Sequence, residues 1–148
     1  MKRIVLIYIL IPLLLLTACS QKPTNTNMDY TAFIDMLIGN GFKYTEAEIN
    51  DDSFLSVPSR PVLIGNEIIS IYVYSSNDDM ERDSQYIDKG GCSISLPEKK
   101  VKISWASAPH FFKKDTLIIT YIGEDEKILE FLNQNYGTEF AGYGYINK

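Results

Sequence analysis

The chain has few of the residues on which most catalytic and metal sites depend. Among its 148 residues, histidine occurs once, as His110, and cysteine twice, as Cys19 and Cys92. One histidine excludes metal sites that take two or three imidazole ligands from a single chain. The sequence also lacks a G-x-S-x-G turn for a serine nucleophile and a glycine-rich loop for phosphate. We therefore expect no cofactor and no metal, and a binding or interaction domain is favoured over an enzyme.

Two further absences concern membranes and nucleic acids. The apolar run near the N-terminus, from Ile4 to Leu16, holds 13 residues, whereas a membrane-spanning helix needs about twenty. Pro12 would also interrupt a helix in that run. The net charge is −5, and the phosphates of nucleic acids require a positively charged surface. A permanent membrane span and a nucleic-acid partner are both disfavoured.

The N-terminus does have the order of charged, apolar and small residues that is typical of a secretory signal peptide. Lys2 and Arg3 precede the apolar run, and small residues follow it. The end of the run resembles a bacterial lipobox, Leu16-Thr17-Ala18-Cys19. The resemblance implies that the Cys19 thiol receives diacylglycerol, that residues 1–18 are removed, and that the new amino terminus is acylated as well. Two or more acyl chains suffice for stable membrane anchoring.

These features predict a lipoprotein that is anchored to the cell membrane through Cys19 and faces the extracytoplasmic side. The alternative is that Cys19 is only a small apolar residue near the end of the signal peptide. Cleavage would remove two cations and so change the net charge from −5 to −7. Lipidation would also leave Cys92 without a second cysteine for a disulfide within the chain. Cys92 begins a segment in which apolar and polar residues alternate, which predicts a buried, unreactive thiol.

The rest of the chain predicts one α+β domain. Residues 19–28 are polar and show no apolar periodicity, so we expect a flexible tether there, followed by a single domain over residues 29–148. Apolar residues from Tyr30 to Ile38 recur at helical spacing. Acidic residues at the start and glycine at the end predict two further helices, Ser76–Lys89 and Glu124–Tyr136.

Alternating and β-branched segments predict the strands. Pro61–Ile64 and Glu67–Tyr74 are joined by Gly65-Asn66, a pair that suits a two-residue hairpin turn. The other expected strands are residues 42–48, a second hairpin formed by residues 92–96 and 101–105, and an uncharged central strand over residues 116–122. The expected fold is a mostly antiparallel sheet of five to six strands, built from hairpins, with about three helices packed on one face.

One segment, Pro109-His110-Phe111-Phe112-Lys113-Lys114, brings an imidazole, two aromatic rings and two cations together. One interpretation is a recognition surface, where Phe111, Phe112 and the nearby Trp105 stack on a sugar or peptide and Lys113 and Lys114 bind an anionic group. The alternative is a corner between strands. There a phenylalanine would fill the end of the core and His110 would hydrogen-bond a backbone carbonyl.

Three short motifs resemble a family of small secreted bacterial lipoproteins of unassigned function. They are Trp105-x-x-x-Pro109-His110-Phe111, Ile118-x-x-Tyr121-x-Gly123 and Gly137-x-x-Phe140-Ala141-Gly142. The resemblance covers about residues 54–142, implies an extracytoplasmic location and supplies no catalytic or ligand-binding residue.

The leading hypothesis is therefore a non-enzymatic binding domain whose partner is an envelope protein or a cell-wall glycan. One alternative is a small envelope hydrolase or metal-dependent enzyme centred on His110. Another is an inhibitor or chaperone-like partner of an envelope protein.

Two remaining segments could bind ligands. Residues 79–83 (DMERD) have the opening spacing of a calcium loop but lack its later glycine and glutamate, so a solvated helix face is favoured. The aromatic tail, residues 140–145 (FAGYGY), could stack on a glycan or pack on the sheet edge, with Phe140 buried.

Overall fold

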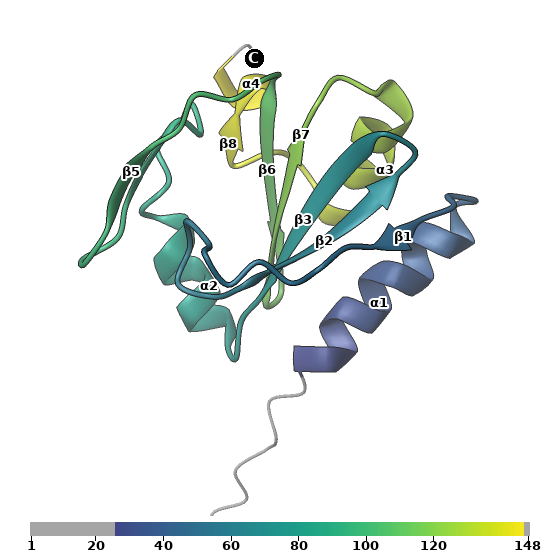
Figure 1. The fold of residues 1–148 in the computed structure, drawn as a ribbon, viewed down its shortest axis with the longest axis horizontal. Coiled ribbons are helices and arrows are strands. Elements are labelled where there is room, and N and C mark those ends of the chain that lie inside the picture. Colours follow the sequence, from purple (N-terminus) through teal and green to yellow (C-terminus); the bar gives the residue numbers. More distant parts are fainter. Residues whose placement is uncertain (1–25, 147–148) are drawn as a thin grey trace, which may run out of the picture.

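A computed structural model describes residues 26–146, so the signal peptide, Cys19 and most of the expected tether lie outside the described residues. A six-stranded antiparallel sheet has the strand order β1-β2-β3-β7-β6-β8, and β4 and β5 form a separate ribbon (Figure 1). The predicted α+β class is confirmed. The strands are β1 (Thr45–Glu46), β2 (Ser59–Ile64), β3 (Glu67–Val73), β4 (Ser93–Ser95), β5 (Lys100–Lys102), β6 (Pro109–Lys114), β7 (Leu117–Ile122) and β8 (Ala141–Gly142). The helices are α1 (Thr26–Gly39), α2 (Asn77–Ser84), α3 (Glu126–Tyr136) and α4 (Tyr143–Ile146).

The two predicted hairpins are confirmed. β2 and β3 pair in the register Ile64↔Glu67, which leaves Gly65 and Asn66 as the turn. Gly65 has a φ of 61°, a conformation that glycine adopts without a steric penalty. β4 and β5 pair around Ile94↔Val101, as the alternation of their residues indicated.

The uncharged segment predicted to be the central strand is also confirmed as β7. It pairs with β3 on one side and β6 on the other, and its residues 117–121 are all buried. Both faces of this strand are covered, which explains why its sequence is continuously apolar instead of alternating.

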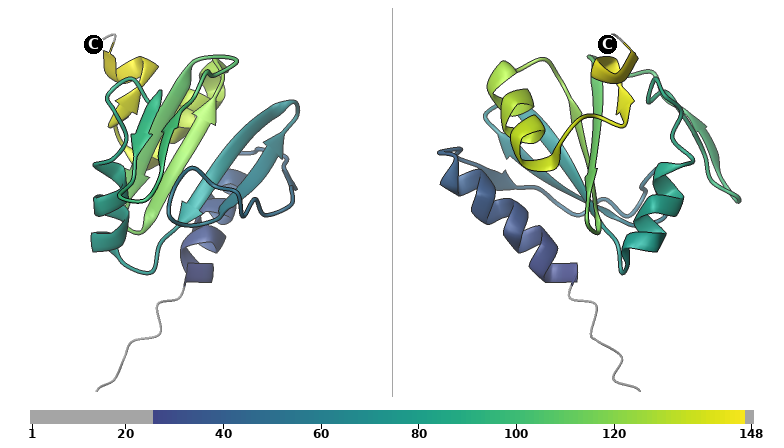
Figure 2. Two further views of the ribbon diagram at one scale, coloured as in Figure 1. Left: turned by 60° about the vertical axis from the view of Figure 1, so that its left-hand side comes forward. Right: turned by 180° about the vertical axis from the view of Figure 1, so that it is seen from behind.

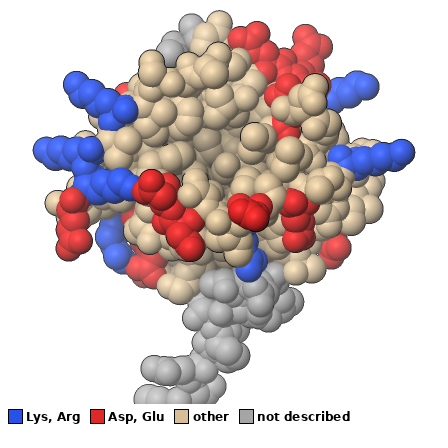
Figure 3. Space-filling view, viewed as in Figure 1, with Lys and Arg blue, Asp and Glu red and all other residues tan. Residues whose placement is uncertain are grey.

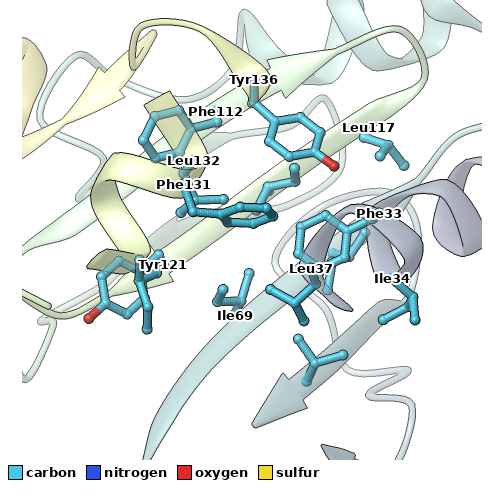
Figure 4. Close-up of a cluster of buried hydrophobic side chains, with 14 residues drawn as sticks. Phe33, Ile34, Leu37, Ile69, Phe112, Leu117, Tyr121, Phe131, Leu132 and Tyr136 are labelled. Carbon is cyan, nitrogen blue, oxygen red and sulfur yellow. The ribbon is translucent and has the colours of Figure 1, made fainter. Parts of the chain in front are cut away.

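One face of the sheet packs against α1 and α3 (Figure 4). Helix α1 contributes Phe33, Ile34 and Leu37, and helix α3 contributes residues of its apolar stripe, including Phe131. Aromatic rings meet edge to face in this cluster, with the Phe33 and Phe131 ring centroids 6.1 Å apart. Such geometry adds about 0.5–1.5 kcal/mol to the stabilisation from buried area.

The opposite face is covered by α2, by the β4–β5 ribbon and by the loop before β2. Met80 of α2 and Ile94 of β4 pack there against Tyr72 and Ile118 of the sheet and against Tyr74, which directly follows β3. The expectation that all helices pack on one face is therefore wrong for α2, and Figure 2 shows α2 across the sheet from α1. Residues of β3 and β7 alternate between two apolar clusters, so each face needs a cover.

Several predicted elements differ in length. The tether prediction extended to residue 28, but α1 already begins at Thr26. β1 has only two residues, which pair with Leu63 and Val62 of β2. The pairing ends at the next residue of β2, Pro61, because Pro61 accepts a hydrogen bond from the Ala47 N–H but has no N–H to donate in return. Helix α2 ends at Ser84, since Ile87 leaves the helix to bridge Ile94.

Cys92 is exposed, and the prediction that it is buried is wrong. Gly91 turns the backbone with a φ of 70°, so the alternation of β4 begins only at Ser93. None of the helices in the described part of the chain is long and apolar enough to span a membrane. Figure 3 shows acidic and basic side chains at the margin of this face, and further acidic side chains across its lower half.

Candidate functional site

The segment predicted to be a recognition surface or a corner is a regular strand, β6. Phe111 and Phe112 are both 0 % exposed and point to opposite faces of the sheet, one into each apolar cluster. Neither ring can stack on a ligand in solvent, so the recognition surface is wrong for these two residues. The prediction that a phenylalanine here fills the core is confirmed, although no corner is formed.

His110 joins three segments within the core. Its side chain is 4 % exposed. Nδ1 lies 2.9 Å from Glu139 Oε1, and Nε2 lies 3.0 Å from the carbonyl oxygen of Gly123. The other oxygen of Glu139 accepts the Gly144 N–H at 3.0 Å. The prediction that His110 bonds a backbone carbonyl is confirmed.

This geometry bears on the enzyme alternative centred on His110. A carboxylate does lie beside the imidazole, as that alternative requires. Both ring nitrogens are nevertheless engaged within the protein and the ring is buried, so neither nitrogen is free to exchange a proton with a substrate. The pair fixes the C-terminal segment to the ends of β6 and β7.

The structure separates the two predicted lysines, and it packs Trp105 against the buried Phe111 ring, with the ring centroids 6.2 Å apart. Lys113 Nζ lies 2.5 Å from Glu81 Oε2 and 3.0 Å from Ser84 Oγ, while Lys114 Nζ donates to the carbonyl of Asn135. Consecutive strand residues point to opposite faces, which separates the two lysines. Trp105 Nε1 donates to the Gly91 carbonyl at 2.8 Å, so this ring holds a loop in place.

The aromatic tail forms β8 and the short helix α4. Tyr143 and Tyr145 remain 54 % and 37 % exposed, whereas Phe140 packs partly against the second apolar cluster. Lys89 Nζ lies 4.6 Å from the centre of the Tyr145 ring. The tail therefore combines both interpretations: Phe140 packs on the core, while Tyr143, which meets the His110 ring edge to face, and Tyr145 are partly exposed.

A groove that the sequence did not indicate lies between the N-terminal loop before β2, helix α2 and the β4–β5 ribbon. We call it the Asp83 groove. Its volume is about 490 Å³, and its lining combines apolar residues with both signs of charge: Ser53, Leu55, Ser56, Arg82, Asp83, Tyr86, Leu96, Pro97, Glu98 and Lys99. A volume of this size lies within the range of small-ligand sites, roughly 300–1,000 Å³.

Asp83 is the buried charged residue of this groove, with only 5 % of its surface exposed. Oδ2 accepts three hydrogen bonds: from the Ser56 N–H at 2.9 Å, the Ser56 hydroxyl at 2.6 Å and the Tyr74 hydroxyl at 2.9 Å. Burial, and then the charge of Asp83, raise the pKa of Tyr74 above its ordinary value, which keeps the phenol protonated as a donor. All three of these bonds go to Oδ2, and Oδ1 is not among the buried atoms of the described residues that lack a partner.

Two cations border the groove. Arg82 contacts Asp79 at 2.5 Å, and both side chains are partly exposed. The hydroxyls of Ser76 and Ser75 and the guanidinium of Arg82 hold the pKa of Asp79 below its usual value. Lys99 Nζ donates to the Ser53 carbonyl at 2.8 Å and lies 3.5 Å from an exposed Asp52 carboxylate. The groove is thus lined by a buried anion, Asp83, by two cations and by the exposed Glu98.

A second hollow of about 600 Å³ lies between α3 and the end of α1. Its charged residues Lys43, Lys127 and Glu130 are all exposed, and no buried charge lines it. We therefore place the candidate site at the Asp83 groove.

Asp83 belongs to the acid-rich segment that the sequence favours as a solvated helix face. That interpretation holds for Asp79 and Glu81, whose side chains are partly exposed, but is wrong for Asp83. Met80, Asp83 and Ser84 are the buried residues of α2, and their i, i+3, i+4 spacing was the available signal. In the described part of the chain, no group of three or more histidine, cysteine, aspartate or glutamate residues could hold a metal ion.

Comparisons of the chain with protein-family models, with curated proteins and with solved structures found no match.

Proposed function

We propose that this protein is a lipid-anchored binding protein on the extracytoplasmic face of the bacterial cell membrane, and that the Asp83 groove is its ligand-binding site. The observation that carries the binding role is the buried carboxylate of Asp83, which lines the groove and is held in place by three hydrogen bonds to Oδ2. A preorganised polar group in a mixed apolar groove is typical of small-molecule sites.

The anchoring role is supported by the N-terminal sequence. A charged start, an apolar run and the lipobox-like Leu16-Thr17-Ala18-Cys19 occur in the order that a lipoprotein precursor requires. Only residues 20–25 separate Cys19 from the first turn of α1. Six residues span at most about 20 Å, so the acyl chains would hold the domain close to the membrane surface.

Metabolic labelling with a fatty acid tests the anchor. The parent chain should incorporate the label and sediment with membranes, whereas Cys19→Ala should lose the label and the membrane association. Cys92→Ala is the matched control, because it removes the other thiol, which is exposed in the folded domain. Labelling that survives in Cys19→Ala, or that is lost in Cys92→Ala, would contradict the proposal.

A further inference from the structure

We propose that the Asp83 groove binds a small zwitterion, in which an ammonium group contacts Asp83 and a carboxylate contacts the cations at the edge. α-Amino acids and short peptides with free ends belong to this class. The inference rests on the proposed function in one respect only, that the Asp83 groove is the binding site.

The ammonium end follows from the surroundings of Asp83. Its three hydrogen-bond donors are an amide and two hydroxyls, all uncharged, so they orient the carboxylate but do not neutralise it. A buried charge without an opposite charge is costly. A ligand ammonium would supply that charge and a charge-assisted hydrogen bond to Oδ1. A neutral sugar hydroxyl would supply only the hydrogen bond.

The carboxylate end follows from Arg82 and Lys99. Both line the groove. Arg82 pairs with the partly exposed Asp79, and Lys99 pairs with the exposed Asp52 and donates to the Ser53 carbonyl. Exposed ion pairs contribute little to stability, about 0–1 kcal/mol. Arg82 can therefore turn towards a ligand carboxylate at small cost to the fold, and Lys99 can do so in exchange for its hydrogen bond to Ser53.

The remaining lining suits the body of such a ligand. Leu55, Leu96 and Pro97 provide apolar surface between the buried anion and the cations at the edge. The volume of about 490 Å³ leaves room for a peptide of two residues as well as for a single amino acid. A dipeptide is therefore the appropriate probe.

Calorimetric titration of the mature lipidated chain, residues 19–148, in detergent micelles tests the inference. The probes are the twenty alanyl-X dipeptides, each with free ends, with an acetylated amine and with an amidated carboxyl group, together with the neutral disaccharide sucrose. At least one free dipeptide should bind, and either cap should weaken it tenfold or more. If no free dipeptide binds, or capped forms bind equally well, the inference is wrong.

Binding of sucrose alone would also overturn the inference, but it would leave the proposed binding role of the groove intact. The lipid-labelling experiment is independent of all these outcomes. Failure of the inference and failure of the proposed anchor are therefore distinguishable.

Variants locate the two ends of the ligand. Asp83→Asn should weaken the best free dipeptide at least tenfold, while Asp78→Asn, the same change at an exposed position of α2, should leave its affinity unchanged. Lys99→Gln changes a partly exposed side chain, and the glutamine amide is also a hydrogen-bond donor, so we expect the fold to tolerate this change. This variant should weaken the free dipeptide but not its amide. Equal effects of Lys99→Gln on both forms, or equal effects of Asp83→Asn and Asp78→Asn, would contradict the assignment.

Discussion

Tyr74 and Tyr136 are both buried, and they differ in what their hydroxyl groups contact. The Tyr74 hydroxyl donates to Asp83 at 2.9 Å. The Tyr136 hydroxyl has no hydrogen-bond partner among the described residues, and Figure 4 shows it near the apolar side chain of Leu117. Burial raises the pKa of both phenols. Only at Tyr74 does a hydrogen bond offset the cost of desolvating the hydroxyl.

Removing the two hydroxyls should therefore have opposite effects. Tyr74→Phe should lower the free energy of unfolding by about 1–3 kcal/mol, because Asp83 loses one of its three donors. Tyr136→Phe should leave it unchanged or raise it by about 1 kcal/mol, because an unsatisfied buried hydroxyl is removed. Urea unfolding of the two variants measures both changes. A larger loss for Tyr136→Phe than for Tyr74→Phe would contradict this account.

At the scale of the elements, β8 depends on a close approach to β6 that only glycine permits. Gly142 has a φ of 109°, and a Cβ atom there would lie 2.2 Å from the carbonyl oxygen of Pro109. The N–H of Gly142 also donates to the carbonyl of Lys89 at 2.9 Å, which ties the tail to the segment after α2.

Gly142→Ala should therefore destabilise the fold and release the C-terminal tail. The expected loss is about 1–3 kcal/mol in the free energy of unfolding, since both the backbone conformation and the contact are unfavourable for alanine. Gly39→Ala is the matched control, because Gly39 ends α1 with no atom within 4 Å of the added Cβ. Hydrogen exchange of the β8 amides should accelerate in the first variant only, and equal exchange in both would count against the close packing.

The elements also show which features the sequence predicts. Local turn chemistry identified the β2–β3 hairpin, since Gly65-Asn66 needs no long-range information. The sequence did not identify β6 as a strand. Phe111 and Phe112 face two different apolar clusters, so the alternation of apolar and polar residues that marks a strand with one buried face is absent. The sequence also did not indicate that Asp83 is buried, because the hydrogen-bond donors that permit its burial, Ser56 and Tyr74, come from other parts of the chain. A buried carboxylate depends on such tertiary partners.

At the scale of the whole molecule, buried phenols make the fold sensitive to alkali. Burial is the main reason that the pKa of Tyr30 and the pKa of Tyr121 are each raised from the usual 10 to about 12. A pKa that is raised in the folded state favours the protonated phenol there. The resulting stabilisation is complete below pH 10 and is lost as the pH rises towards 12.

The free energy of unfolding should therefore fall between pH 10 and pH 12. Urea unfolding at a series of pH values measures this slope, and tyrosinate absorbance follows the ionisation directly. Tyr121→Phe should reduce the slope, because the hydroxyl that contacts Glu67 Oε2 at 2.8 Å can no longer ionise. A slope that is the same in the variant would show that the alkaline sensitivity has another origin, such as lysine deprotonation.

The most direct test of the central claim is a map of where a ligand binds. Amide chemical shifts of the isotope-labelled lipoprotein in micelles can be recorded during titration with the free alanyl dipeptides. The largest shifts are predicted at Ser56, whose N–H donates to Asp83, and around Arg82 and Lys99. Shifts confined to the exposed tail residues Tyr143 and Tyr145, with the Asp83 groove unaffected, would contradict the account.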